Sequence, residues 1–214
     1  MRRRRPPTVL RSGDPRPRRL TELVALPRRS PLYPELARAL AAADGAHLFT
    51  TNLCPVPVRS TAATSQSGCY RMREGDPVDL RVSRRHDRVP LSFLHELGHL
   101  LDHQLAPAPR AFASPRLREF GAWRTAVATL ESRAPAHASR GRQRYLDSWR
   151  ELWARSYAQA IIERSGDPSL TGQLRALQAD DDVFVWPAGE FEPVAREVEA
   201  VLARLGLVAG RRAA

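Results

Sequence analysis

Three residues in the middle of the chain, His95, Glu96 and His99, have the pattern of a metal site with its own base. In a helix, residues four apart lie on one face about one turn from each other, so both imidazoles can point at one ion. Zinc accepts neutral imidazole nitrogens, and a catalytic zinc takes three protein ligands and keeps one position open for water. Glu96 then stands where a general base can take the proton of that water. The spacing predicts a catalytic Zn²⁺ site.

The surroundings of this motif indicate a buried helix. Gly98 interrupts an otherwise apolar pattern, and a glycine costs a helix about 1 kcal/mol relative to alanine. We therefore expect another element to pack closely at Gly98, and we expect the helix to end before Pro107. The apolar positions are Phe93, Leu94, Leu97, Leu100 and Leu101.

The third zinc ligand is not settled by the motif. His103 lies eight residues beyond His95, about 12 Å further along a continuous helix, whereas zinc–ligand bonds are about 2 Å long. His103 is an alternative metal ligand only if the helix is broken. Asp102 lies on the same helix face as the two histidines but one turn beyond them, too far to be a ligand. We expect it to hold a ligand or a nearby backbone group by a hydrogen bond.

Glu151 is the candidate third ligand from a later helix. The segment from Tyr145 to Ile162 has a strongly apolar side and is predicted to be helical, with Glu151 near its start. Ser148 and Glu151 also have the spacing of a capping box, in which the glutamate reaches back to a backbone amide. Spacing alone leaves the two roles equally open.

The remaining pattern predicts an α+β fold with a small sheet. Further helices are expected over 34–43, 116–132 and 192–205, short strands over 47–51 and 78–82, and a loop or irregular hairpin over 54–77. A strand shortly before the His95 helix favours an edge strand beside the metal, where an extended peptide can bind by main-chain pairing.

Composition and charge indicate one domain with a basic tail. The chain has 214 residues, of which 43% are hydrophobic, enough for one sizeable core. Residues 1–30 contribute +8 of the net charge of +11, and all 34 basic residues are arginine. We expect 1–30 to be a disordered tail, 31–207 to form the domain and 208–214 to be a short disordered tail. Contact of residues 1–30 with nucleic acid is the partner that this charge allows.

Nothing in the sequence indicates export or a membrane anchor. No segment approaches the roughly 20 apolar residues that a membrane span needs, and the N-terminal segment lacks the apolar stretch of a secretory signal. A cytoplasmic protein is the default expectation. Cys54 and Cys69 are then expected to stay reduced.

The combined motifs resemble those of the glutamate-type zincin metallopeptidases. His95-Glu-Leu-Gly-His99-x-x-Asp102, followed by Glu151-Leu-Trp-Ala154, is similar to the catalytic domain of anthrax lethal factor, to the proline-specific endopeptidases and to the metallopeptidase domains of phage and plasmid polyvalent proteins. The resemblance implies that Glu151 is the third zinc ligand and that Tyr145 stabilises the oxyanion. Tyr145 stands one residue closer to the glutamate than in lethal factor, so Tyr70 and Tyr157 remain alternatives.

Two alternative functional hypotheses fit the same sequence. Regulator-cleaving peptidases found beside phage repressors have a similar His-Glu-Leu-Gly-His-Leu-Leu-x-His run, in which His103 fits better. A non-catalytic protein that keeps the zincin fold and binds nucleic acid through its tail is the second. The leading hypothesis is a zinc metalloendopeptidase that acts on a protein or peptide substrate, with Glu96 as the general base.

Overall fold

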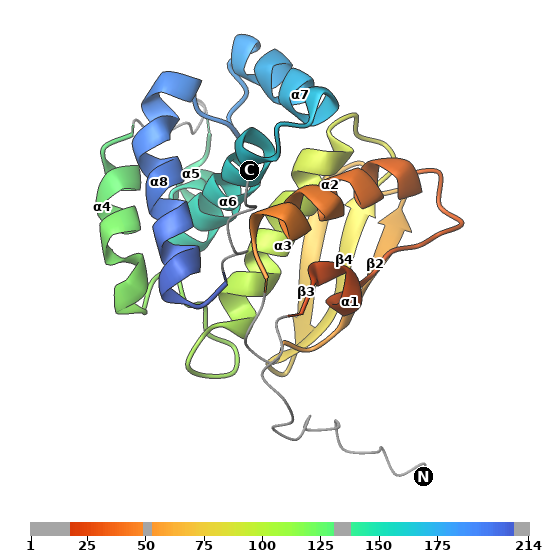
Figure 1. The fold of residues 1–214 in the computed structure, drawn as a ribbon, viewed down its shortest axis with the longest axis horizontal. Coiled ribbons are helices and arrows are strands. Elements are labelled where there is room, and N and C mark those ends of the chain that lie inside the picture. Colours follow the sequence, from red (N-terminus) through yellow and green to blue (C-terminus); the bar gives the residue numbers. More distant parts are fainter. Residues whose placement is uncertain (1–17, 49–52, 131–137, 208–214) are drawn as a thin grey trace, which may run out of the picture.

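The computed structural model describes residues 18–48, 53–130 and 138–207 (Figure 1). This part of the chain is α+β and 55% helical, with a small mixed sheet, as the sequence predicts. The strands are β1 (Val24–Ala25), β2 (Val56–Thr61), β3 (Gly68–Arg73) and β4 (Asp76–Ser83). The helices are α1 (Leu20–Leu23), α2 (Tyr33–Ala46), α3 (Val89–Gln104), η1 (Arg118–Phe120), α4 (Gly121–Ala128), α5 (Arg140–Leu146), α6 (Trp149–Ser165), α7 (Pro168–Ala179) and α8 (Ala188–Arg204).

The sheet has the strand order β1-β2-β4-β3, in which β3 is an edge strand. β1, β2 and β4 are mutually parallel neighbours, and β3 pairs antiparallel with β4. The expectation of a loop or irregular hairpin over 54–77 is therefore correct only for the antiparallel pairing of β3 with β4, which has a register shift at Arg71 and Met72, and it missed strand β2. The predicted strand 78–82 exists, but it lies inside the sheet. β3 is the edge strand that contacts α3, and it has no fully buried residue that could have marked it in the sequence.

The N-terminal segment is folded from Arg18 onward. Leu20, Leu23 and Val24 are buried in the same core as the rest of the domain, and the Leu20 amide donates a 2.5 Å hydrogen bond to Asp44. The expected tail boundary at residue 30 is wrong for residues 18–30, since three apolar side chains suffice to anchor α1 and β1. Residues 1–17 and 208–214 lie outside the described residues, as do residues 49–51 of the expected strand 47–51.

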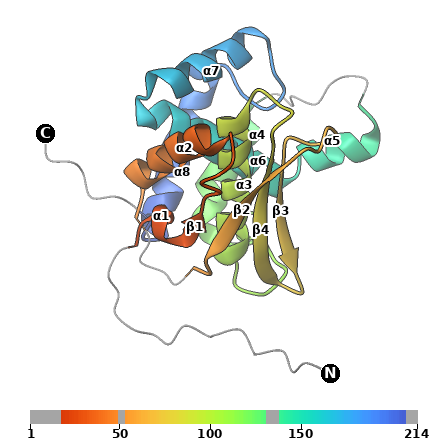
Figure 2. The same cartoon turned by 90° about the vertical axis from the view of Figure 1, so that its right-hand side faces the viewer.

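Helix α3 lies between the sheet and α6. It contacts β3 and β4 on one side and α6 on the other, while α2 packs against both helices (Figures 1 and 2). The expected helix from Tyr145 to Ile162 is broken, because Tyr145 belongs to α5 and Ser148 adopts an extended conformation before α6. No helix among the described residues is long and apolar enough to cross a bilayer.

Aromatic side chains pack between α4 and the start of α6. Trp123 of α4 lies edge-on to Trp149 and Trp153 of α6, with ring centroids 6.1 and 5.4 Å apart. Phe120 closes the cluster at 4.7 Å from Trp153. Phe120, Trp123, Trp149 and Trp153 thus form one aromatic cluster. It fixes the start of α6, the helix that carries Glu151.

Candidate metal centre

The close crossing of α3 and α6 brings the two motifs together. A Cβ atom built on Gly98 would lie 2.9 Å from the Ala154 Cα and 3.3 Å from the Ala154 carbonyl oxygen. Only glycine fits at such a distance, which confirms the expected close packing at this residue. Ala154 lies one turn after Glu151, so the contact between the two helix backbones places Glu151 opposite the histidines.

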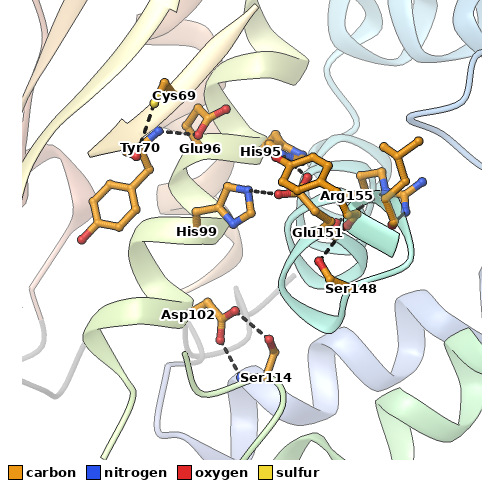
Figure 3. Close-up of polar contacts among 12 residues, drawn as sticks. Cys69, Tyr70, His95, Glu96, His99, Asp102, Ser114, Ser148, Glu151 and Arg155 are labelled. Carbon is orange, nitrogen blue, oxygen red and sulfur yellow. Dashed lines mark hydrogen bonds and ion pairs between the residues drawn. The ribbon is translucent and has the colours of Figure 1, made fainter. Parts of the chain in front are cut away.

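His95, His99 and Glu151 converge on one point (Figure 3). The His99 Nε2 atom lies 3.1 Å from Glu151 Oε1, and the His95 Nε2 atom lies 3.4 Å from Glu151 Oε2. Candidate ligand atoms of all three residues lie within 4.8 Å of one another, and they form the one such group found among the described residues. The sequence hypothesis for the ligand set therefore has a matching geometry.

The donor set and its dimensions fit zinc. Two ligands bound at about 2.0–2.1 Å to a tetrahedral ion lie about 3.3 Å apart, close to the 3.1 and 3.4 Å separations. Burial alone would raise the pKa of Glu151, but its hydrogen bonds with His95 and His99 outweigh burial and hold that pKa far below its ordinary value. The carboxylate is thus ionised and largely desolvated, which favours a bound cation.

Glu151 does not act as a helix cap. Ser148 is the N-cap residue of α6, yet its side chain makes no capping hydrogen bond. The Ser148 hydroxyl donates to the Tyr145 carbonyl at 2.7 Å instead. Of the two roles that the spacing left open, the structure has the glutamate directed at the histidines.

Glu96 lies beside the three candidate ligands and contacts the edge strand. The Tyr70 amide donates a 2.6 Å hydrogen bond to Glu96 Oε2. A Cβ atom on Gly68 would lie 2.7 Å from Glu96 Oε1, so a larger residue at position 68 would require the Glu96 side chain to move. The sequence analysis missed both β3 contacts, since a loop or irregular hairpin over 54–77 gives no reason to place Gly68 or Tyr70 beside Glu96.

Tyr145 is the tyrosine that faces the centre. It lines the same cavity as His95, Glu96 and Glu151. Burial, the charges of the two glutamates and a hydrogen bond with Glu151 raise the pKa of Tyr145 above its ordinary value. The phenol therefore keeps its proton at neutral pH and can donate a hydrogen bond.

The other two candidate tyrosines direct their hydroxyls elsewhere. Tyr157 is fully buried, and its hydroxyl lies 2.7 Å from Nε2 of His47. The Tyr70 hydroxyl lies 2.6 Å from Nδ1 of His103. His103 thus contacts the edge strand and is not brought into the candidate ligand group, as expected for a continuous α3.

Asp102 holds a backbone group, one of the two roles expected for it. Its two carboxylate oxygens accept hydrogen bonds from the Ser114 amide and hydroxyl, both at 2.6 Å. Burial raises the pKa of Asp102 to about 6, although these hydrogen bonds act in the opposite direction. The contact anchors the segment after α3, which carries Phe112, against the end of the metal-site helix; the Phe112 ring lies 6.5 Å from that of His99.

Arg155 is a supporting residue that the sequence analysis missed. Its buried guanidinium donates to the Leu146 carbonyl and, at 3.0 Å, to the Val183 carbonyl. It thereby joins the end of α5 to α6 and fixes Tyr145 relative to Glu151. Its position four residues after Glu151, on the same helix face, is the signal that could have identified it.

Two cavities meet at the centre. The larger, of about 510 Å³, extends past Leu91 and Phe184. The smaller, of about 170 Å³, extends past Tyr70 and Phe112. Gly68, Glu96, Tyr145 and Glu151 line both. A chain that crosses the centre would therefore have room for a side chain on either side of it.

Comparisons of the chain with protein-family models, curated proteins and solved structures found no match. The resemblance to glutamate-type zincins accordingly rests on the site residues themselves. Their placement in space, with two imidazoles and a carboxylate around one point and a second carboxylate beside it, is the basis for any functional assignment.

Proposed function

We propose that this protein is a zinc-dependent metalloendopeptidase with a zincin-like catalytic domain. The observation that carries the proposal is the convergence of His95, His99 and Glu151 beside Glu96, in a cavity bordered by an edge strand. Two histidines and one glutamate are a known ligand set of catalytic zinc, which leaves the fourth position for water or substrate.

Glu96 is the proton carrier of the proposed reaction. Bound zinc would supply Lewis acidity, which lowers the pKa of water and polarises a carbonyl group. Glu96 lies next to the ligands and is 6% exposed, so it can accept the proton of the attacking water with little competition from solvent. It then returns that proton to the amine that leaves when the peptide bond breaks.

Tyr145 stabilises the negative charge that develops on the carbonyl oxygen. Its raised pKa keeps the phenol protonated, and the guanidinium groups of Arg142 and Arg150 each lie over its ring, 5.5 Å from the centroid. A donor positioned in this way contributes a few kcal/mol to transition-state stabilisation.

Strand β3 provides the surface for the substrate main chain. It pairs with β4 on one side only, and on its other side the Tyr70 amide points at Glu96. An extended peptide can add to such an edge by main-chain hydrogen bonds. This placement would bring a peptide bond next to Glu96.

The test combines metal content with peptide cleavage. Elemental analysis is expected to find one zinc per chain in the wild type and in Glu96→Gln, and a loss of zinc in Glu151→Ala. A library of peptides from a digested proteome, read by mass spectrometry, should be cleaved by the wild type and about 10²–10⁴-fold more slowly by Glu96→Gln. Glu190→Gln, a change at an exposed glutamate of α8, is the matched control and should match the wild type. Full activity in Glu96→Gln, or a wild type without zinc, would show the proposal to be wrong.

A further inference from the structure

Two arginines beside the centre have no acidic partner among the described residues. Arg142 lines the larger cavity and Arg150 lines the smaller one, and the guanidinium groups of both lie over aromatic rings. Some arginines of the domain are instead paired with carboxylates: Arg88 with Asp182 at 2.5 Å and Arg164 with Glu199 at 2.6 Å. Each cavity is therefore lined by one arginine that forms no ion pair with a carboxylate of the described residues.

Two residues that line the larger cavity each have a buried polar atom without a partner. The Ser92 hydroxyl and the His86 Nε2 atom are both buried and make no hydrogen bond within the described residues, and both residues line this cavity. Ser92 is 6% exposed. Buried polar atoms without a partner are uncommon, because an unmade hydrogen bond costs about 1–3 kcal/mol. A group that accepts hydrogen bonds from these atoms would remove that cost.

The acidic groups in these cavities already have tasks. Glu96 and Glu151 are the carboxylates that line both, and in the proposed function one carries protons and the other binds zinc. The cavity walls outside the centre thus present the positive groups of Arg142 and Arg150 to the space where substrate side chains would lie. Leu91 and Phe184 add apolar surface to the larger cavity, which suits the methylene groups of a glutamate side chain.

We propose that the substrate is an acidic segment of polypeptide, with a carboxylate side chain on each side of the cleaved bond. The side chain in the larger cavity contacts Arg142 and also Ser92, once the Ser92 hydroxyl has rotated toward the cavity. The side chain in the smaller cavity contacts Arg150. This inference rests on the proposed peptidase function and names the substrate class for the same site.

The experiment is a cleavage profile of the zinc-loaded full chain on the proteome-derived peptide library. We expect aspartate or glutamate to be enriched at the two positions that flank the cleaved bond. Arg142→Glu should lower the ratio of acidic to basic residues about tenfold or more at one of these positions, and Arg150→Glu at the other, because like charges then oppose each other. Arg144→Glu is the matched control. It makes the same charge change on α5 but lines neither cavity, and it should keep the wild-type profile.

The outcomes separate this inference from the proposed function. A zinc-loaded wild type that cleaves no peptide would refute the proposed function itself. Cleavage without any preference for acidic residues would overturn the acidic-substrate inference and leave the peptidase intact. An acidic preference that persists in both charge-reversal variants would also overturn it, because the two arginines would then not be its source. The readout is the ratio of acidic to basic residues at each position, measured within one variant. A lower overall cleavage rate, caused by a change in the position of Tyr145, therefore does not affect the result.

Discussion

The substitution Gly98→Ala tests whether the contact between α3 and α6 sets the geometry of the centre. The added methyl group would lie 2.9 Å from the Ala154 Cα, where an ordinary contact is 3.4–4 Å. The obstructing atoms belong to a helix backbone and cannot rotate away. Helix α6 therefore has to move by about 0.5 Å, and Glu151 moves with it.

Two effects of this substitution on stability oppose each other. Alanine is the better helix former by about 1 kcal/mol, whereas overpacking of a core costs about 1–3 kcal/mol. Because the contact is with backbone, overpacking wins, and we expect zinc-free Gly98→Ala to be destabilised by about 1 kcal/mol. Zinc–ligand distances tolerate only about 0.2 Å, so zinc affinity should fall about 10- to 100-fold, the range for changes next to metal ligands.

The assay pairs urea unfolding of the zinc-free protein with zinc titration against a chelator. Gly172→Ala in α7 is the control, since a Cβ there has nothing within 4 Å. It should stabilise the protein by about 0.5–1 kcal/mol and leave zinc affinity unchanged. If Gly98→Ala is stabilised as much as Gly172→Ala and binds zinc as tightly as the wild type, the reasoning about the helix crossing is wrong.

Two further predictions concern residues behind the centre. His103→Phe removes the partner of the Tyr70 hydroxyl and so loosens the strand that contacts Glu96. This variant should keep its zinc, and its kcat should fall about fivefold, because the lost hydrogen bond is worth about 1 kcal/mol. His103→Asn should restore part of the kcat. Loss of zinc in His103→Phe would instead show that His103 is a ligand. Burial raises the pKa of Asp102 from 3.8 to about 6, so the folded state binds this proton more tightly and the free energy of unfolding falls as pH rises from about 4 to about 6. Asp102→Asn should remove about 3 kcal/mol of that fall in urea unfolding of the zinc-free protein; parallel pH curves for the two proteins would contradict it.

The α3 motif could be interpreted from sequence because its information is local. The four-residue spacing alone places His95 and His99 on one helix face. Gly98 predicted a close contact with another element but gave no information on which element it is. The contact proved to be with Ala154 of α6. The periodicity of apolar residues in a helix does not indicate which other helix packs against it. The distance between Glu151 and the two histidines could therefore be learned only from the structure.

The sheet was harder to predict for a different physical reason. An edge strand with one paired side and no deeply buried face, such as β3, has no alternating apolar pattern. Its contribution to the centre comes from the Tyr70 main-chain amide, which every residue other than proline possesses. The break between α5 and α6 had a signal in the capping spacing at Ser148, but the apolar pattern that runs across it obscured the boundary.

The position of the tryptophans has an optical consequence. All four, at 123, 149, 153 and 186, lie in the helical part of the chain after α3. Trp149 and Trp153 flank Glu151 within α6, so intrinsic fluorescence should respond when an ion is added at that helix. The same signal is blind to the sheet, which contains no indole. A fluorescence melting curve therefore reports on the helices after α3 and not on the sheet. Hydrogen exchange at the Tyr70 amide would reveal whether the sheet unfolds together with those helices.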